Sequence, residues 1–352
     1  MKKIRVWGIK DLLSLSLSLL LAIILAMGSL QLQAEAATAT EQNRANDSFQ
    51  LGRPLVREME VIITVSNDGN VTARGIQAEV PLLTVPDSPY QKLLAEHFDP
   101  KPQHIITDPS GSRRAIFYLG SLPRGEKLNI VINYLLLVYP IEYSLGKSSA
   151  AGSGYPGEAL VYLEPSTKIE SSNKAIAALA DKLAAGADNL TVAYRFYSYV
   201  LDHITYNSFS RYRNQGALAA LKYGEGVCED MSALFVALCR ARGIPARIVY
   251  GYADPGRTGE RFNLTARERL PLRGLRHAWA EFYLEDYGWI PVDPSFDKVV
   301  GGEKYFGSIP EASHILQNYA DHPVKIKYRS GNGLSAYWGE SLISPPQHFQ
   351  AK

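Results

Sequence analysis

The sequence has few cysteines, almost no excess charge and only one long hydrophobic run. The 352 residues include only two cysteines, a pair that in an exported protein would suggest a disulfide. The formal net charge is +2, and this excess lies within the first 36 residues, so the rest of the chain offers no basic surface of the kind that attracts nucleic acids. We therefore expect no nucleic-acid partner.

The two cysteines are, however, unsuited to pairing with each other. Cys228 and Cys239 fall in one predicted helix, where a rise of ~1.5 Å per residue separates them by about 16 Å. A disulfide holds its two Cα atoms within about 7 Å, so we expect two free thiols. Free thiols in an exported protein need an explanation, and catalysis supplies one for Cys228.

The one long hydrophobic run lies at the N-terminus. A basic start, an apolar stretch over residues 12–27 and the small-x-small sequence ending at Ala36 have the order of a secretory signal. We expect a signal peptide over residues 1–36; an uncleaved anchor is the alternative, because residues 12–32 are long enough to cross a bilayer. In either case we expect the body of the protein outside the cytoplasm, secreted or in the cell envelope.

The N-terminal half has the pattern of a β domain. After a polar lead-in over residues 37–55, residues 56–165 show short apolar strands separated by turn clusters, which is typical of an immunoglobulin-like β-sandwich. The Asn-Asp-Gly-Asn turn at residues 67–70 predicts a hairpin between strands at 59–65 and 71–81. No motif in this half carries chemistry, so we expect a spacer or binding module.

Helical periodicity begins near residue 172 and gives way to strands after Gly243. Helices followed by strands predict an α+β domain over residues 172–330, and residues 331–352 are expected to form a C-terminal tail. The expected helices cover residues 175–183, 192–204, 217–221 and 229–242, and the expected strands cover residues 247–252, 277–284, 289–292 and 323–329.

Cys228 stands at the start of a mostly apolar helix, directly after Gly224 and Gly226. Free N–H groups at a helix start favour a thiolate and can hold the oxyanion of an attacked carbonyl. Glu229 and Asp230 oppose this effect, so a cationic partner, which should be histidine, has to supply much of the activation. The alternative is a small buried hydrophobe; a glycine-flanked turn is a poor place for one.

A histidine and an aspartate are predicted to meet on one face of a hairpin. If the loop covers residues 284–288, Trp279 opposes Asp293, and His277 lies diagonally two residues away with Cβ atoms roughly 7 Å apart. A carboxylate can reach an imidazole nitrogen across that distance. Cys228, His277 and Asp293 would then be the thiol version of nucleophile, base and orienting group.

A metal site is not expected. His277 and Glu281 point to the same side of a strand but stand ~13 Å apart, and no other ligands cluster with them. We expect no metal ion and no cofactor.

Four segments resemble the core motifs of the transglutaminase-like superfamily, in order and in spacing. They are residues 226–230 (Gly-Val-Cys-Glu-Asp), 243–247 (Gly-Ile-Pro-Ala-Arg), 277–279 (His-Ala-Trp) and 289–295 (Trp-Ile-Pro-Val-Asp-Pro-Ser). The resemblance covers about residues 172–330 and implies a papain-like fold in a bacterial-type exported member. By motif, it assigns Cys228 as nucleophile, His277 as base and Asp293 as orienting carboxylate.

The sequence departs from the calcium-dependent animal transglutaminases. It is shorter, shows no acidic calcium-binding clusters and lacks their two C-terminal β domains. The family's further oxyanion-hole donor cannot be placed by motif; Tyr206 and Gln215 are candidates.

The implied function is acyl transfer through a thioester, with a protein or peptide as substrate. The thiol attacks a peptide or glutamine amide and forms a thioester. If water then hydrolyses the thioester, the enzyme is a cysteine protease, amidase or deamidase; if an amine attacks it, the enzyme is a transglutaminase. The alternative is a catalytically idle module that serves cell-envelope binding or assembly. The arginine-rich loop over residues 254–276 could frame an anionic substrate, or it could be a solvated loop.

Overall fold

The computed structural model describes residues 48–84, 88–146, 154–254, 269–320 and 322–348. The expected signal peptide over residues 1–36 lies outside the described residues. Among the helices that are described, none is both long enough and apolar enough to cross a membrane.

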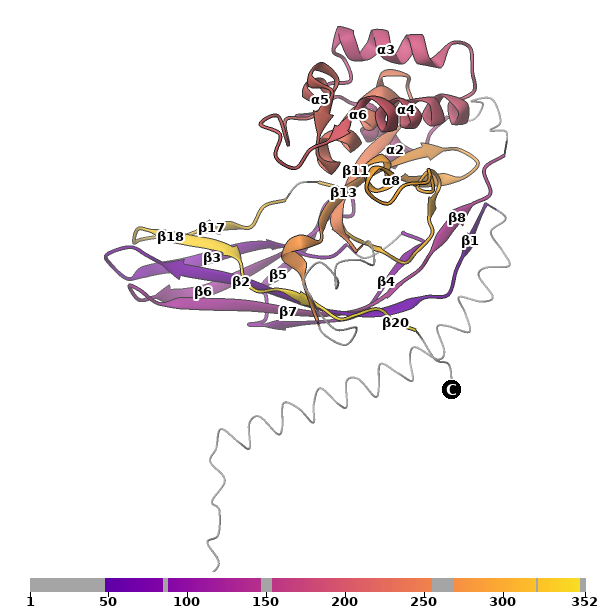
Figure 1. The fold of residues 1–352 in the computed structure, drawn as a ribbon. Coiled ribbons are helices and arrows are strands. Elements are labelled where there is room, and N and C mark those ends of the chain that lie inside the picture. Colours follow the sequence, from indigo (N-terminus) through magenta and orange to yellow (C-terminus); the bar gives the residue numbers. More distant parts are fainter. Residues whose placement is uncertain (1–47, 85–87, 147–153, 255–268, 321, 349–352) are drawn as a thin grey trace, which may run out of the picture. The chain divides into compact units, whose positions relative to one another are not determined.

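Two facing antiparallel sheets form the β-rich region (Figure 1). One has the order β12-β19-β2-β7-β4, with β18 and β20 also pairing with β2, and the other has the order β17-β3-β6-β5. Alternate residues of β2, such as Met59, Val61 and Ile63, are buried against Val80 and Phe117 of the opposite sheet, as expected when one face of each strand faces the core. The strands of the N-terminal half are β1 (Phe49–Leu51), β2 (Leu55–Asn67), β3 (Ala73–Pro81), β4 (Gln91–Asp99), β5 (His104–Thr107), β6 (Arg113–Leu122), β7 (Lys127–Val138) and β8 (Ile141–Tyr143). Of these, β1 and β8 form a separate small sheet with β15 (Ser308–Ile309).

The prediction of a hairpin around residues 67–70 was wrong, although both of the predicted strands are present. β2 and β3 lie in different sheets, because β2 pairs with β7 and β18 while β3 pairs with β6 and β17. The turn is stabilised by Asn67, whose side-chain amide donates to the carbonyls of Val71 and Leu122 at 2.9 and 2.8 Å. The turn residues therefore carry the chain from one sheet to the other.

The last part of the chain returns to these sheets. Within the segment expected as a tail, β18 (Leu334–Trp338), β19 (Leu342–Ile343) and β20 (Gln347–His348) all pair with β2. The strand expected at residues 323–329 is β17 (Lys325–Lys327), which pairs with β3. Sequence periodicity does not reveal partners so distant in the chain.

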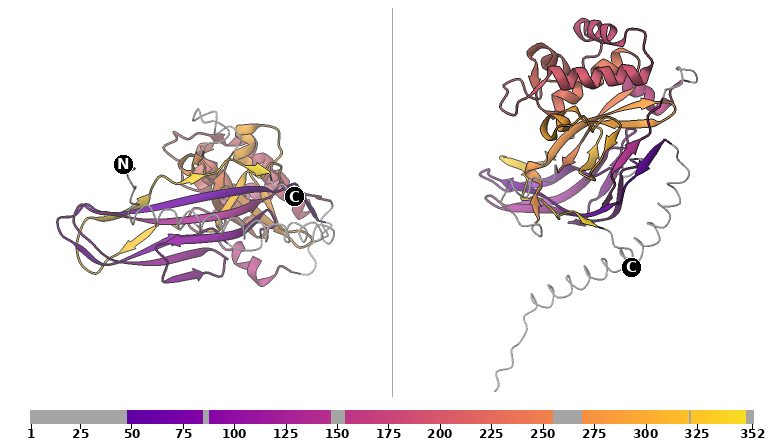
Figure 2. Two further views of the ribbon diagram at one scale, coloured as in Figure 1. Left: turned by 90° about the horizontal axis from the view of Figure 1, so that it is seen from below. Right: turned by 45° about the vertical axis from the view of Figure 1, so that its right-hand side comes forward.

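The remaining elements form a mixed α/β core around a sheet of order β14-β13-β11-β16. Helix α6 packs on β13 and β11, and α3, α4 and α5 lie around α6 (Figure 2). The helices are α2 (Gly157–Leu160), α3 (Lys174–Ala184), α4 (Asn189–His203), α5 (Ala217–Tyr223), α6 (Cys228–Ala241) and α8 (Pro294–Val300), with short 3₁₀ turns η1 (Val161–Leu163) and η2 (Leu272–Gly274). The strands in this part of the chain are β9 (Thr205–Tyr206), β10 (Glu225–Gly226), β11 (Ala246–Ala253), β12 (Leu270–Pro271), β13 (Arg276–Leu284), β14 (Gly288–Val292), β15 (Ser308–Ile309) and β16 (His314–Asn318). Outside the core sheet, β9 pairs with β10, β12 belongs to the larger facing sheet and β15 pairs with β8.

One hydrophobic core joins the facing sheets to this α/β core. Tyr252 of β11 and Ile315 of β16 are buried in the same cluster as the inner residues of β2 and β7. Tyr90, just before β4, donates a hydrogen bond to Glu281 Oε1 of β13 at 2.8 Å. The sheet β14-β13-β11-β16 is therefore held from both sides.

Candidate active site

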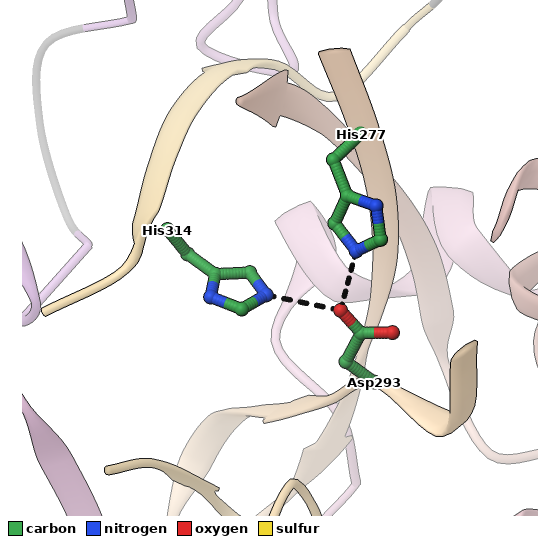
Figure 3. A group of neighbouring side chains, drawn as sticks. All are labelled: His277, Asp293 and His314. Atoms are coloured by element: carbon green, nitrogen blue, oxygen red, sulfur yellow. Dashed lines mark hydrogen bonds and ion pairs between the residues drawn. The ribbon is translucent and has the colours of Figure 1, made fainter. Parts of the chain in front are cut away.

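The hairpin register places the aspartate as the spacing predicted. β13 and β14 pair antiparallel with Ala280 opposite Val292 and Leu284 opposite Gly288, so Trp279 and Asp293 face each other one step further on. His277 Nε2 lies 2.5 Å from Asp293 Oδ2, as Figure 3 shows. The diagonal contact expected from the sequence is present.

Asp293 is held rigidly because it also begins a helix. Its Oδ1 accepts hydrogen bonds from the backbone N–H of Phe296 at 2.9 Å and from the Ser295 hydroxyl at 2.7 Å, which is the geometry of an N-cap followed by proline at N1. These two donors fix the carboxylate plane and leave Oδ2 for His277. The Asp-Pro-Ser sequence thus serves to begin helix α8 as well as to place the carboxylate beside His277.

His277 is set up to carry a positive charge. Burial by itself disfavours the imidazolium, but the carboxylate of Asp293 and the thiol of Cys228 outweigh it and raise the pKa of His277 to about 10. Burial likewise works against the Asp293 carboxylate, and the two histidines that contact it nevertheless hold its pKa well below the usual range. The pair is therefore ionised at neutral pH.

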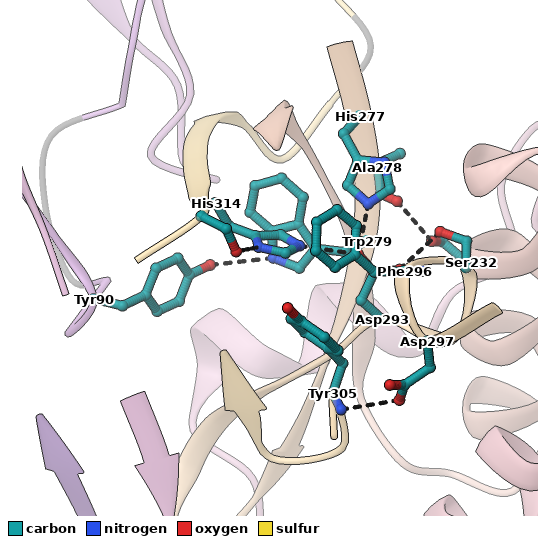
Figure 4. A network of polar contacts seen from close by, with 12 residues as sticks. Tyr90, Ser232, His277, Ala278, Trp279, Asp293, Phe296, Asp297, Tyr305 and His314 are labelled. Atoms are coloured by element: carbon teal, nitrogen blue, oxygen red, sulfur yellow. Dashed lines mark hydrogen bonds and ion pairs between the residues drawn. The ribbon is translucent and has the colours of Figure 1, made fainter. Parts of the chain in front are cut away.

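Cys228 is the first residue of α6 and is only partly buried. Cys228 is one of the groups whose charge raises the pKa of the His277 imidazole. One turn later on the same helix, the Ser232 hydroxyl donates to the carbonyl of Ala278 at 3.3 Å, next to His277 (Figure 4). The helix that carries Cys228 is thereby tied to the strand that carries His277.

The acidic residue at the third position of α6 organises the turn before Cys228. Asp230 is fully buried and accepts from the backbone N–H groups of Asn214, Gly216 and Val227 at 2.8, 3.0 and 3.0 Å. A Cβ on Gly226 would come within 2.6 Å of the Asp230 Cβ, so this glycine is required by the fold. The sequence predicted that Asp230 would weaken the positive potential at the start of the helix. In the structure its carboxylate charge is instead compensated by three backbone N–H donors.

His314 is the residue that sequence reasoning missed. Its Nε2 lies 2.9 Å from Asp293 Oδ2, the same oxygen that His277 contacts, and its side chain is fully buried. It belongs to β16, which pairs with β11. The sequence signal available was a single histidine in a short apolar segment, which does not reveal its partner.

His277, Asp293 and His314 offer atoms of the type that bind metals, all within 4.8 Å of one another. The expectation that no further ligand clusters near His277 was therefore wrong. However, the N···O separations of 2.5 and 2.9 Å are hydrogen-bond distances, and the remaining carboxylate oxygen already has two donors. We interpret the trio as a hydrogen-bonded network.

Glu281 serves the fold. It forms a buried ion pair with Arg247 at 2.7 Å, and the guanidinium of Arg247 lies 3.9 Å from the ring of Trp289 and 3.6 Å from that of Tyr319. Such stacking suits a planar, weakly hydrated cation. This ion pair gives a structural role to Arg247, the last residue of the segment 243–247, and to Glu281, four residues after His277.

The other residues singled out in the sequence, Cys239, Gln215 and Tyr206, make contacts outside the His277–Asp293–His314 group. Cys239 is fully buried and free, and burial raises the pKa of its thiol well above the usual value. Gln215 donates to the Arg211 carbonyl at 3.0 Å, while Tyr206 pairs in register with Gly226, two residues before Cys228. Most of the arginine-rich loop, residues 255–268, lies outside the described residues.

Comparison with known proteins finds one family model. Residues 177–294 match the transglutaminase-like superfamily, a segment that contains Cys228, His277 and Asp293. A crystal structure of a candidate cysteine protease from Cytophaga hutchinsonii has a similar fold, with a TM-score of 0.55 and 16% identity, covering 85% of this chain and 100% of that one. At this identity the likeness concerns the fold alone.

Two bacterial proteins are related in sequence over short stretches. A protein-glutamine gamma-glutamyltransferase of Pseudomonas aeruginosa is 34% identical over 106 residues, which are 30% of this chain and 15% of that protein. An uncharacterized protein of Haemophilus influenzae is 40% identical over 76 residues, 20% of this chain and 21% of that protein. The chain thus spans about a fifth or less of either relative. The family match therefore identifies residues 177–294 of this chain as a domain of the transglutaminase-like superfamily.

Proposed function

We propose that this protein is an exported thiol acyl-transfer enzyme that acts on peptide or glutamine amides. Cys228 is the nucleophile, His277 is the general acid and base, and Asp293 orients the imidazole. The observation that supports this proposal is the 2.5 Å contact between His277 Nε2 and Asp293 Oδ2, together with the influence of Cys228, the first residue of α6, on the pKa of that imidazole. Membership of a superfamily that includes a glutamyltransferase relative agrees with it.

The arrangement places a positive charge beside the sulfur of Cys228. With its pKa raised to about 10, His277 holds a proton near pH 7 and faces the sulfur with a positive charge. A neighbouring imidazolium and a helix start both lower the cost of ionising a thiol. Because Asp293 occupies Nε2 of the ring, Nδ1 is left to exchange a proton with the substrate.

The first half of the cycle makes a thioester. The Cys228 thiolate attacks the amide carbonyl carbon, a C–S bond forms, and the carbonyl electrons move to oxygen. When the tetrahedral intermediate collapses, the C–N bond breaks and His277 Nδ1 gives its proton to the departing amine or ammonia. The N–H groups at the start of α6 are placed to stabilise the oxyanion.

The second half releases the acyl group. Water or a primary amine attacks the thioester carbonyl, His277 accepts its proton, and the Cys228 thiolate leaves. Water yields a carboxylic acid and an amine yields a new amide. The same three residues serve both outcomes.

The rest of the chain gives this activity its setting. The proposed signal at residues 1–36 sends the enzyme out of the cytoplasm, to a protein or peptide substrate in the cell envelope or beyond. We propose that the two facing sheets are an immunoglobulin-like domain that acts as a spacer or binding module. Residues 56–165 and 172–330 remain the proposed bounds of the two domains, with residues 331–352 following them.

Alkylation by iodoacetamide, followed by peptide mass spectrometry, tests the nucleophile. We expect Cys228 to react at pH 7 at a rate nearly independent of pH, and the His277→Ala variant to react at least about tenfold more slowly at pH 7, recovering as pH rises toward the thiol pKa. Cys239 is the internal control for an inert thiol. Equal, slow labelling of both cysteines would instead support an idle module.

A second assay separates the reactions. The protein is incubated with a glutamine peptide and a labelled primary amine, and the Cys228→Ala variant is the control. Uptake of the amine identifies a transglutaminase, conversion of glutamine to glutamate a deamidase, and backbone cleavage a protease. No product from any of several glutamine peptides, despite a reactive thiol, would contradict action on glutamine.

A further inference from the structure

A second histidine is buried beside the catalytic pair. His314 is fully buried and packs edge-on against Trp279 and Phe296, with ring centroids 5.0 and 4.8 Å apart. Its Nε2 points at Asp293 Oδ2 at 2.9 Å, while its Nδ1 lies 2.8 Å from the Ser313 hydroxyl. Figures 3 and 4 show both histidines converging on one carboxylate.

The partners of His314 define its protonation state. An ionised carboxylate only accepts hydrogen bonds, so Nε2 must carry the hydrogen that Asp293 receives. A neutral ring then has an acceptor at Nδ1, which the Ser313 hydroxyl can satisfy. Burial lowers the pKa of His314, and the positive charge of His277 acts in the same direction against the attraction of Asp293. His314 is therefore a neutral donor.

A histidine that only filled the core would not need this position. Trp279, Phe296 and Tyr305 already enclose the ring, and a phenylalanine could make the same apolar contacts. The pairing of β11 with β16 shifts register between Tyr250 and Gly251, with the additional residue, Gln317, on β16. A Cβ on Gly251 would come within 2.0 Å of the Ile315 carbonyl oxygen, so the two strands approach closely here. The local backbone is thus shaped to bring β16 against the site.

We propose that His314 is a positioning residue that holds Asp293 Oδ2 toward His277 and shares the negative charge of that oxygen. The inference rests on the proposed function, because it assigns His314 a role in the Cys228–His277–Asp293 reaction. A carboxylate oxygen with two donors attracts each of them less strongly than an oxygen with one. His314 therefore keeps the imidazolium of His277 acidic enough to release its proton to a leaving amine.

Other ionisable groups near Asp293 leave this assignment intact. Cys228 faces His277 from α6, and Asp297 lies in α8, where it accepts from the Tyr197 hydroxyl and from the Tyr305 backbone N–H at 2.9 Å. Burial, and then nearby carboxylates, raise the pKa values of Tyr197 and Tyr305 well above the usual range. Both tyrosines are thus neutral wherever His277 titrates.

The test measures the proton equilibrium of His277 directly. In protein labelled with ¹³C and ¹⁵N at histidine, the ring signals of His277 are followed between pH 6 and 11 in the wild type and in the His314→Phe and His314→Gln variants. Phenylalanine keeps the ring volume and removes the donor, while glutamine places an amide N–H near the Nε2 position. The matched control is His322→Phe, which removes a histidine 3.4 Å from Asp108, away from the site.

We expect the His277 midpoint to rise by about one pH unit in His314→Phe, roughly tenfold in its dissociation constant. It should return toward the wild-type value in His314→Gln and stay unchanged in His322→Phe. An unchanged midpoint in His314→Phe would overturn the role of His314, while a reactive Cys228 in the same sample would leave the proposed function standing. An unreactive Cys228 in the wild type would overturn both.

A measurement on the wild type keeps the proposal falsifiable if His314→Phe does not fold. The ring nitrogen shifts of His314 should report a neutral ring with its hydrogen on Nε2 from pH 5 to 9. A charged ring, or a hydrogen on Nδ1, would contradict the assignment because neither state divides the charge of Asp293 in the way proposed.

Discussion

Replacing Asp293 with asparagine is expected to detach the base from its carboxylate while leaving α8 capped. The amide oxygen of asparagine can replace Oδ1, which accepts from Phe296 N–H and the Ser295 hydroxyl. The amide nitrogen cannot replace Oδ2, because it would meet the donors of His277 and His314 with hydrogens of its own. The variant thus separates the catalytic role of the residue from its structural one.

The size of the effect follows from the contacts. A hydrogen bond to a charged group is worth about 1.5–3 kcal/mol, and one pKa unit corresponds to about 1.4 kcal/mol. The pKa of His277 should therefore fall by about one to two units from its value of about 10. Loss of the orienting carboxylate should lower kcat by about 10⁴-fold, the size of effect seen when the orienting carboxylate of a catalytic triad is replaced by an amide.

The stability effect has a defined pH dependence. Because the pKa of His277 is raised in the folded state, its contribution is complete below about pH 6.5 and is lost as pH rises through about 10. The pKa of Asp293 is depressed, so its contribution is present above its usual value of about 3.9 and is lost as pH falls below that. The difference in unfolding free energy between wild type and variant should be largest in the neutral range.

Urea unfolding at pH 4, 7 and 10, together with the amine-uptake or cleavage rate, measures these quantities. The Asp293→Ala variant is the control, since it also removes the cap of α8 and should cost roughly a further 1 kcal/mol. Activity of Asp293→Asn within tenfold of wild type, or a destabilisation that is the same at every pH, would refute the reasoning.

Three further substitutions test the surroundings of the site. Tyr90→Phe should destabilise by about 1–3 kcal/mol in urea unfolding, because it removes the 2.8 Å hydrogen bond to Oε1 of the buried Glu281; an unchanged midpoint would show that this bond is dispensable. Gly226→Ala should abolish preferential alkylation of Cys228, since its Cβ displaces Asp230, and wild-type labelling would contradict this. Cys239→Ala should keep full activity. A loss of activity larger than its loss of stability can explain would show that the second thiol takes part in the reaction.

The local elements of the site were predictable because they are encoded by adjacent residues. The length of the loop after Leu284 fixes the hairpin register, and the register alone brings His277 and Asp293 together. Helix α6 was predictable from the apolar pattern of its residues and from Gly243, which marks its end. These predictions needed no knowledge of partners elsewhere in the chain.

The features that were missed all depend on distant partners. His314 contacts Asp293 only because β16 pairs with β11 from the other side of the sheet, and periodicity within five residues cannot reveal such a pairing. The turn at residues 67–70 has a hairpin composition, but burial against two facing sheets decides where each strand goes. The final strands are short, and their pairing with β2 has no local signature.

The pairing of β18, β19 and β20 with β2 has a consequence for biogenesis. β2 begins at Leu55, but three of its neighbours come from residues 334–348, so a sheet started early in synthesis is finished only when the last strands emerge. An edge of backbone donors and acceptors stays open for that whole interval and could template aggregation. Export in an unfolded state, followed by folding of the released polypeptide, would let both halves of the sheet meet at once.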